Sequence, residues 1–270
     1  MSTVWVNGKL QNHVSVNDRG FTYGDGLFET VRVTSSEPEL LSAHISRLEK
    51  GLQRLKFPEK TLSDLLQDLE RVAFDGDQVL KIIVSRGEGL RGYGLPEHCN
   101  ITRVIQLSNL ADFSRQSEQG VALRTCQYQL ALNPALAGMK HLNRLEQVMA
   151  RSEWQDSEIA DGVVTDLDGY VVECTMSNIF WVEGNVVYTP VVNRCGVEGV
   201  MRNHLIGCLK AQGVVVEEGL YSLDSLNRAD EIFISNSLIQ IWPVNKLDAS
   251  FFELGPVTKR LQKLLQESLH

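Results

Sequence analysis

Residues 138–148 read GMKHLNRLEQV and form the most informative stretch of the chain. Lys140 follows a loop of small residues and precedes a helix that the apolar spacing predicts over Leu142–Trp154. The apolar neighbours Met139 and Leu142 can shield the amine from water, and such burial lowers the pKa of a lysine. A shielded lysine can act as a Schiff-base nucleophile, whereas most lysines are simply solvated. The stretch alone leaves both interpretations open.

Two stretches further along the chain could supply partners for such a lysine. Glu173 lies in a β-rich run, where a carboxylate either decorates the strand surface or is the buried partner of a cation. Residues 196–202, GVEGVMR, lead a glycine loop into a predicted helix. The free N–H groups of a helix start bind anions, although ordinary capping is the alternative. An amine, a carboxylate and an anion-binding helix start are together the parts of a pyridoxal phosphate site.

The glycines of residues 87–92, GEGLRG, match the dinucleotide fingerprint literally. That fingerprint binds a pyrophosphate only where a helix begins, and the following residues 93–96, YGLP, cannot start a long helix. A glycine-rich loop is the better interpretation. Its arginines, Arg86 and Arg91, make it a candidate anion-binding loop.

Other chemical motifs have little support. His204 and Cys208 lie four residues apart on a predicted helix, which is half of a metal site without a second pair nearby, so we expect no metal. There is no GxSxG motif and no P-loop pattern. The five cysteines form no CxxC pair and leave an odd thiol, which argues against a disulfide framework or a zinc ribbon.

Composition narrows the class of protein. The 270 residues include 26 Lys and Arg against 34 Asp and Glu, and this net charge of −8 argues against a protein that coats nucleic acid or anionic membrane. The longest strictly apolar run is the four residues 179–182, far short of the roughly 20 that span a bilayer. The first residues do not resemble a signal peptide. We therefore expect a cytoplasmic protein.

The periodicity predicts two mixed α/β domains. Short strands alternate with helices over residues 1–109, residues 110–120 form a polar linker, and residues 121–270 form a second α/β domain that carries Lys140. Hairpin turns are expected at the dipeptides Asn7-Gly8, Asp168-Gly169 and Gly184-Asn185.

Five segments in this order resemble the class IV, or fold type IV, pyridoxal phosphate enzymes, and the resemblance covers nearly the whole chain. The family includes branched-chain and D-amino acid aminotransferases and aminodeoxychorismate lyases. It implies an α/β (α+β) fold of two mixed domains with the cofactor cleft between them, and a homodimer. The segments are residues 23–30 (YGDGLFET), 44–48 (HISRL), 140–146 (KHLNRLE), 173–180 (ECTMSNIF) and 196–202 (GVEGVMR).

The resemblance also implies residue roles. Lys140 would hold the cofactor as a Schiff base and move the proton, and Glu173 would pair with the pyridine nitrogen, keeping it protonated so that the ring accepts electrons. Thr30 would face the same side as Phe28 and help proton transfer. The residues implied to bind the phosphate or support the cofactor are Arg47, Ser177, Asn178, Val200, Met201, Asn236 and Ser237. The residues implied to contact the substrate are Phe28, Arg91 and Tyr93.

Within the family, residues 138–148 and the run from Ser85 to Tyr93 are most similar to the lyases. Phe28 stands where the D-amino acid aminotransferases carry a tyrosine, and Tyr93 stands where they carry a histidine. The expected reaction converts 4-amino-4-deoxychorismate to 4-aminobenzoate and pyruvate. Two alternatives stay open: a D-amino acid or branched-chain aminotransferase on the same fold, and a cofactor-free binding protein that keeps only the fold.

Overall fold

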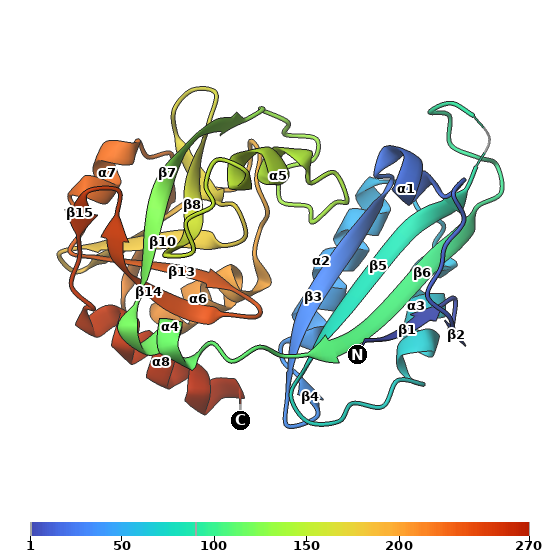
Figure 1. Ribbon diagram of the computed structural model, residues 1–270, viewed down its shortest axis with the longest axis horizontal. Coiled ribbons are helices and arrows are strands. Elements are labelled where there is room, and N and C mark those ends of the chain that lie inside the picture. Colours follow the sequence, from blue (N-terminus) through green and yellow to red (C-terminus); the bar gives the residue numbers. More distant parts are fainter. Residues whose placement is uncertain (1, 90, 270) are drawn as a thin grey trace. The chain divides into compact units, whose positions relative to one another are not determined.

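The computed structural model describes residues 2–89 and 91–269 and divides the chain into two compact units (Figure 1). Unit 1 contains Met1–Ala111 and the short segment Met139–Asn143. Unit 2 contains Asp112–Gly138 and Arg144–His270. The class of fold is the expected one, since each unit combines a β-sheet with helices.

Unit 1 is built on a six-stranded antiparallel sheet in the order β2-β1-β6-β5-β3-β4. Along β3, alternate residues are buried because successive side chains point to opposite faces of a strand. The first hairpin turns at Asn7-Gly8, as expected, and both residues have positive φ, at 51° and 71°. The strands are β1 (Thr3–Val6), β2 (Lys9–Leu10), β3 (Gly26–Thr34), β4 (Glu37–Pro38), β5 (Gln78–Glu88) and β6 (Asn100–Asn109).

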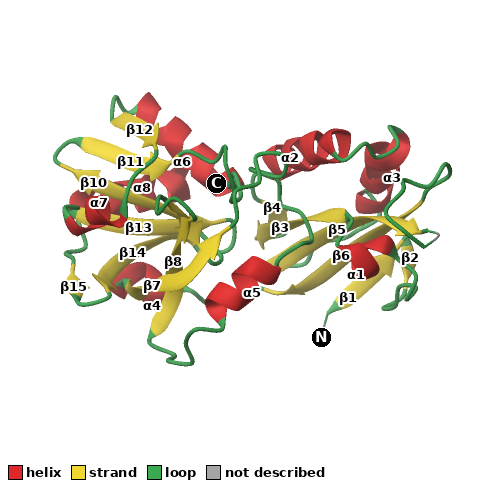
Figure 2. Cartoon of the chain, turned by 90° about the horizontal axis from the view of Figure 1, so that it is seen from above, coloured by secondary structure: helices red, strands yellow, loops and turns green. Residues whose placement is uncertain are grey.

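Helices α2 and α3 lie on one face of this sheet (Figure 2). The apolar face of α2 follows the helical period, and it buries Leu48 and Leu52 almost completely. Burial of each leucine contributes about 1.5–3 kcal/mol. The helices of unit 1 are α1 (Arg19–Tyr23), α2 (Leu41–Arg54) and α3 (Lys60–Leu69).

Unit 2 contains a mixed sheet in the order β12-β11-β10-β13-β14-β7-β8-β9, with β15 paired to β14. The pairs β11 with β12, β14 with β7 and β7 with β8 are parallel. Both expected hairpins are present, at Asp168-Gly169 and Gly184-Asn185. The strands are β7 (Val121–Leu130), β8 (Ile159–Asp166), β9 (Val171–Cys174), β10 (Asn178–Glu183), β11 (Val186–Pro190), β12 (Val215–Gly219), β13 (Glu231–Asn236), β14 (Gln240–Leu247) and β15 (Ser250–Phe251).

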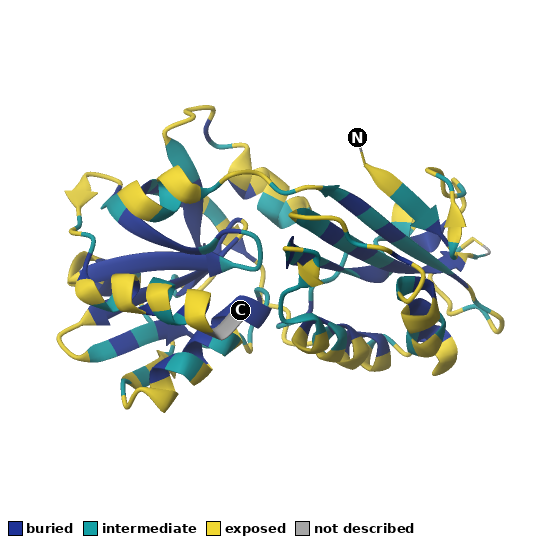
Figure 3. Ribbon diagram, turned by 90° about the horizontal axis from the view of Figure 1, so that it is seen from below, coloured by how far each residue is buried: buried dark blue, intermediate teal, exposed yellow. Residues whose placement is uncertain are grey.

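The core of unit 2 lies along its central strands, where Trp181, Ile232 and Ile234 are each about 1% exposed or less. Figure 3 shows buried residues along these strands and exposed residues on the outer sides of the helices. Helices α6 and α8 pack against each other and against β13. The helices are α4 (Ser114–Gln119), α5 (Leu145–Arg151), α6 (Val200–Ala211), α7 (Leu223–Asn227) and α8 (Pro256–Leu269).

The division between the two units falls between Ala111 and Asp112, inside the expected linker 110–120, and α4 occupies part of that stretch. The segment that carries Lys140 pairs with β3 and groups with unit 1. The helix expected over Leu142–Trp154 is limited to α5, since residues 141 and 142 are used in that pairing. Among the helices of the described residues, none has the length and apolarity to cross a membrane.

Candidate active site

Lys140 lies at the open edge of β3. One edge of β3 pairs with β5, and β4 covers the other edge only at Val33 and Thr34. The segment that carries Lys140 fills the uncovered part. The Lys140 carbonyl accepts a hydrogen bond from Phe28 N at 2.9 Å, and Leu142 N donates to Gly26 O at 3.0 Å. Strand pairing therefore fixes the backbone of the lysine within unit 1.

The side chain of Lys140 lies against an aromatic ring. Its Nζ is 4.3 Å from the centroid of the Phe28 ring, and the residue is half-buried. Thr30 is two residues further along β3, so its side chain points to the same face of the sheet as Phe28. Phe28, whose ring lies beside the Lys140 amine, presents only carbon atoms to it and no hydroxyl group.

Arg47 lies on α2 and forms a buried ion pair with Glu29 of β3. Arg47 Nε is 2.8 Å from Glu29 Oε1, and His44 Nδ1 is 2.6 Å from Glu29 Oε2. Burial raises the pKa of Glu29, but the hydrogen bonds and positive charge of His44 and Arg47 outweigh this effect and lower the pKa below its ordinary value. Glu29 is therefore a stable carboxylate at neutral pH.

Glu173 of β9 is buried, with 5% of its surface exposed. Its Oε2 accepts a hydrogen bond from Val197 N at 2.9 Å, and the Asn178 side chain donates to Val197 O at 3.0 Å. Gly196 has a φ of 82°, and a Cβ there would lie 2.7 Å from Val172 Cγ1, so only glycine fits. Glu173 is therefore a buried carboxylate and not an exposed residue of the strand surface, and its pairing with a cation stays a prediction.

Helix α6 begins at Val200, directly after Gly199, and no side chain caps it. A Cβ at Gly199 would lie 2.0 Å from Asn178 Oδ1, so the glycine allows a close approach of the helix start to β10. The first N–H groups of a helix, here those of Val200 and Met201, have no partner within the helix, and they suit an anion. Arg202, although in the same motif, turns away and donates to Pro190 O at 2.8 Å.

The turn between β9 and β10 is held by a buried carboxylate that no local pattern marks. Asp161 accepts hydrogen bonds from Thr175 Oγ1 at 2.6 Å and from Ser177 Oγ at 2.8 Å. Burial raises the pKa of Asp161, while the hydrogen bonds from Thr175 and Ser177 oppose that shift. Ser177 therefore supports the turn through Asp161. Its expected contact with a cofactor stays a prediction.

Asn236 closes β13 and organises the next turn. Its side chain donates to Met176 O at 3.1 Å and accepts from Leu238 N and Ile239 N. Ser237 lies within that turn and is half-buried. Asn236, which is expected near the phosphate, is thus linked through Met176 to the turn that follows Glu173.

Arg144 is a further group near Glu173 for which the sequence predicted no role. Burial lowers the pKa of Arg144, and the negative charges of Glu173 and Glu146 oppose that shift. The residue immediately precedes α5. A half-buried arginine near the buried Glu173 carboxylate marks this end of unit 2 as charged and polar.

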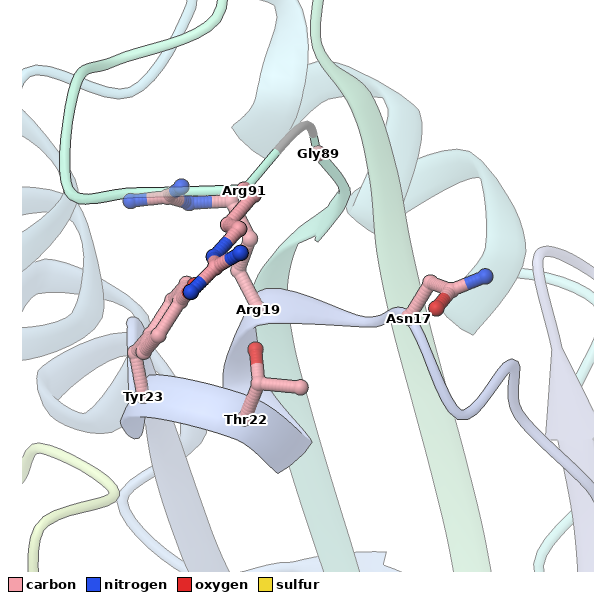
Figure 4. Close-up of a pocket in the computed structure, with 6 residues that line it drawn as sticks. All are labelled: Asn17, Arg19, Thr22, Tyr23, Gly89 and Arg91. Atoms are coloured by element: carbon pink, nitrogen blue, oxygen red, sulfur yellow. The ribbon is translucent and has the colours of Figure 1, made fainter.

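In unit 1, a pocket of about 210 Å³ lies between α1 and the loop after β5 (Figure 4). Arg91 and Arg19 both project into it, above Tyr23 and Thr22. Arg19 donates to Asp25 Oδ2 at 2.9 Å and thereby carries a fixed role in the fold. The pocket is lined by Asn17, Arg19, Thr22, Tyr23, Gly89 and Arg91.

The structure tests two expectations for the loop after β5: that Arg86 binds an anion, and that the loop is irregular and does not start a helix. The prediction that Arg86 belongs to an anion-binding loop is wrong: the residue is 2% exposed, and its guanidinium donates to Asp25, Lys56 O and Leu55 O. Tyr93 is 84% exposed, with its ring against Tyr23. The loop is glycine-rich and irregular, as the sequence predicted, and residues 91–99 form no helix before β6 begins at Asn100.

The possible half-site for a metal gains no third ligand. Cys208 Sγ is 3.6 Å from His204 Nε2, one turn apart on α6. Over residues 2–89 and 91–269, no group of three His, Cys, Asp or Glu side chains is placed to hold a metal ion.

Comparison with known proteins identifies the family. Residues 26–247 match the family described as amino-transferase class IV. The chain belongs to the class IV aminotransferases. Enzymes of this family use pyridoxal 5′-phosphate.

Relatives within the family include both lyases and aminotransferases. The chain is 38% identical to an aminodeoxychorismate lyase of Vibrio harveyi, over 96% of this chain and 97% of the relative. It is 30% identical to a D-alanine aminotransferase of Bacillus licheniformis, over 98% and 96%. The crystal structure of 4-amino-4-deoxychorismate lyase from Pseudomonas aeruginosa has a TM-score of 0.94 with this chain at 43% identity, covering 98% of this chain and 99% of that one.

Proposed function

We propose that this class IV enzyme is a pyridoxal phosphate-dependent lyase that converts 4-amino-4-deoxychorismate to 4-aminobenzoate and pyruvate. The observation that carries the proposal is the similarity, over nearly the full length, to lyases at 38% and 43% identity. The D-alanine aminotransferase of comparable coverage is 30% identical. The residue beside the Lys140 amine, Phe28, supports the same choice because it lacks the hydroxyl of the aminotransferase pattern.

The described residues fit this cofactor by their own chemistry. The start of α6 is uncapped, and Gly199 leaves the backbone free of a side chain there, which suits a phosphate. The buried Glu173 suits a protonated ring nitrogen. The residues proposed to hold the cofactor are Lys140, Arg47, Glu173, Ser177, Asn178, Val200, Met201, Asn236 and Ser237.

Bound pyridoxal phosphate supplies an electron sink for a carbanion at the substrate carbon that carries nitrogen. Lys140 Nζ removes the proton from that carbon, and its place against the Phe28 ring keeps the amine oriented on the sheet edge. Glu173 keeps the ring nitrogen protonated through its carboxylate. Thr30, on the same face of β3 as Phe28, is proposed to assist the proton transfer.

The overall reaction balances without a second substrate. Loss of the enolpyruvyl group as pyruvate leaves an aromatic ring, and the two products contain all the atoms of the starting compound. No oxidant and no amino acceptor are needed. Phe28, Arg91 and Tyr93 are proposed to contact the substrate, with the Arg91 guanidinium suited to a carboxylate.

The test is turnover without an added keto acid. Purified protein with bound cofactor is incubated with 4-amino-4-deoxychorismate, and 4-aminobenzoate fluorescence and pyruvate are measured. Equal amounts of both products support the lyase. If amino transfer from D-alanine or a branched-chain amino acid to a keto acid is the only reaction observed, the enzyme is an aminotransferase and the proposal is wrong. A colourless protein that binds no cofactor would instead be a binding protein.

The quaternary structure and the cellular location belong to the same proposal. A homodimer agrees with the family resemblance, and light scattering of the purified protein tests it. Residence in the cytoplasm stays a prediction from the sequence.

A further inference from the structure

A buried charge network lies on the α2 side of β3. Glu29 is 1% exposed, His44 is fully buried, and 14% of the Arg47 side chain is exposed. Such a carboxylate is costly to bury unless it is paired, so the network must be well formed in the folded protein. None of the reaction steps proposed above uses Glu29 or His44.

The pairing fixes the plane of the Arg47 guanidinium. Glu29 Oε1 accepts from Arg47 Nε at 2.8 Å, and Glu29 Oε2 accepts from Arg47 Nη2 at 2.5 Å. This two-point arrangement holds an arginine more rigidly than a single contact. His44 is three residues before Arg47 on the same face of α2, and its Nδ1 donates to Glu29 Oε2 at 2.6 Å. The carboxylate is therefore itself held in place.

The alternation of side chains along β3 places this network on the face of the sheet opposite to Phe28. Phe28 and Glu29 are adjacent, so their side chains point to opposite faces of the sheet. One contacts the Lys140 amine, and the other contacts the Arg47 guanidinium. Both residues are fixed by pairing with Ile83 and Ile82 of β5. Two consecutive residues of β3 thus contact Lys140 and Arg47, the two cationic side chains that the proposed function assigns to the cofactor.

We propose that Glu29 is a positioning residue that orients Arg47 toward the phosphate of the cofactor, with His44 holding Glu29. The inference rests on the proposed function for its ligand. Because Glu29 binds the Nε edge of the Arg47 guanidinium, the side chain keeps one orientation before the cofactor binds. The conformational entropy of the arginine is then lost when the protein folds, and not when the phosphate binds. Without Glu29, that cost falls on the binding of the phosphate.

The test compares two forms of the cofactor. Protein freed of cofactor is titrated with pyridoxal phosphate and with pyridoxal, which lacks the phosphate, in the wild type and in Glu29→Gln. We expect Glu29→Gln to weaken binding of pyridoxal phosphate by about tenfold, the size of a lost charge-assisted contact, and to leave pyridoxal within about twofold. In an Arg47→Ala background, Glu29→Gln should cause no further change in the ratio of the two affinities.

The matched control is Glu39→Gln. Glu39 is also a largely buried carboxylate paired with an arginine of unit 1, since Arg32 Nε lies 3.3 Å from Glu39 Oε1. This variant should leave both affinities unchanged. If Glu29→Gln does not fold, Glu29→Asp keeps the charge but shortens the reach, and it should change the ratio in the same direction.

Equal weakening of both ligands, or no change in either, would overturn the positioning role. Failure of the proposed function has different signatures. A cofactor-free binding protein would bind neither pyridoxal phosphate nor pyridoxal in its wild-type form, and an aminotransferase would bind the cofactor but form no 4-aminobenzoate in the turnover assay.

Discussion

Replacement of Asp161 by asparagine should loosen the turn that joins Glu173 to Asn236. In the wild type, Asp161 Oδ2 accepts from Ser177 Oγ at 2.8 Å and from Met176 N at 3.3 Å. An asparagine that keeps its oxygen toward Thr175 presents an NH₂ group to those two donors. The Ser177 hydroxyl can rotate to accept, but the Met176 N–H cannot.

The magnitude follows from these contacts. A hydrogen bond to a charged group contributes about 1.5–3 kcal/mol, and one such bond is lost outright while another becomes neutral. Removal of a buried charge offsets part of the loss, because burial already raises the pKa of Asp161. We expect a net loss of about 2 kcal/mol in the free energy of unfolding, equivalent to a fall in Tm of about 4–8 °C for a domain of this size.

Thermal unfolding of the cofactor-free protein, followed by circular dichroism, measures this effect. The matched control is Asp112→Asn, the same substitution at an exposed carboxylate that caps Ser114 N, where asparagine serves equally well. Ser177→Ala should lower Tm in the wild type and have less effect in Asp161→Asn, because the two residues share one hydrogen bond. A Tm for Asp161→Asn equal to that of the control would refute this account of the turn.

Three other changes test separate parts of the site. Lys140→Ala should abolish both the visible absorbance of bound cofactor and turnover while leaving the fold intact by circular dichroism; full activity would exclude the proposed mechanism. Gly199→Ala forces a Cβ to within 2.0 Å of Asn178 Oδ1, so we expect a loss of stability of about 1–3 kcal/mol and faster loss of cofactor on dialysis. Normal stability and normal cofactor retention would show that Asn178 and β10 shift to accommodate the added methyl group, which would contradict this prediction. Glu29 has a pKa below its ordinary value of 4.5, so its ionisation stabilises the fold above that pH and stops doing so as the pH falls through the folded-state pKa. The stability difference between the wild type and Glu29→Gln should therefore be greatest near neutral pH and shrink as the pH falls below 4.5, as urea unfolding across pH measures; a constant difference would contradict it.

Local patterns predicted the elements well where the signal lies within a few residues. The dipeptides Asn7-Gly8 and Asp168-Gly169 turn hairpins because their glycines take positive φ. The helical period of residues 41–54 predicts α2, and the glycine loop before Val200 predicts the start of α6. In each case, the residues that set the structure are neighbours in the chain.

Contacts between distant segments were not predictable in this way. The edge pairing of residues 140–142 with β3 moves Lys140 into unit 1, and nothing near Lys140 in the sequence signals it. Arg86 looked like an anion ligand beside glycines, but its partners, Asp25 and the carbonyls of Leu55 and Lys56, come from other parts of the chain. The roles of Asp161 and Glu29 depend in the same way on side-chain contacts across the sheet.

Reduction with sodium borohydride tests the central claim most directly, because it fixes pyridoxal phosphate to the lysine that holds it. The purified protein, loaded with the cofactor, is reduced and digested, and its peptides are sequenced by mass spectrometry. We predict that the phosphopyridoxyl mass is found on Lys140. A label on another lysine, or no label on a protein that is otherwise folded, would contradict the assignment of this chain as a lyase that acts through Lys140.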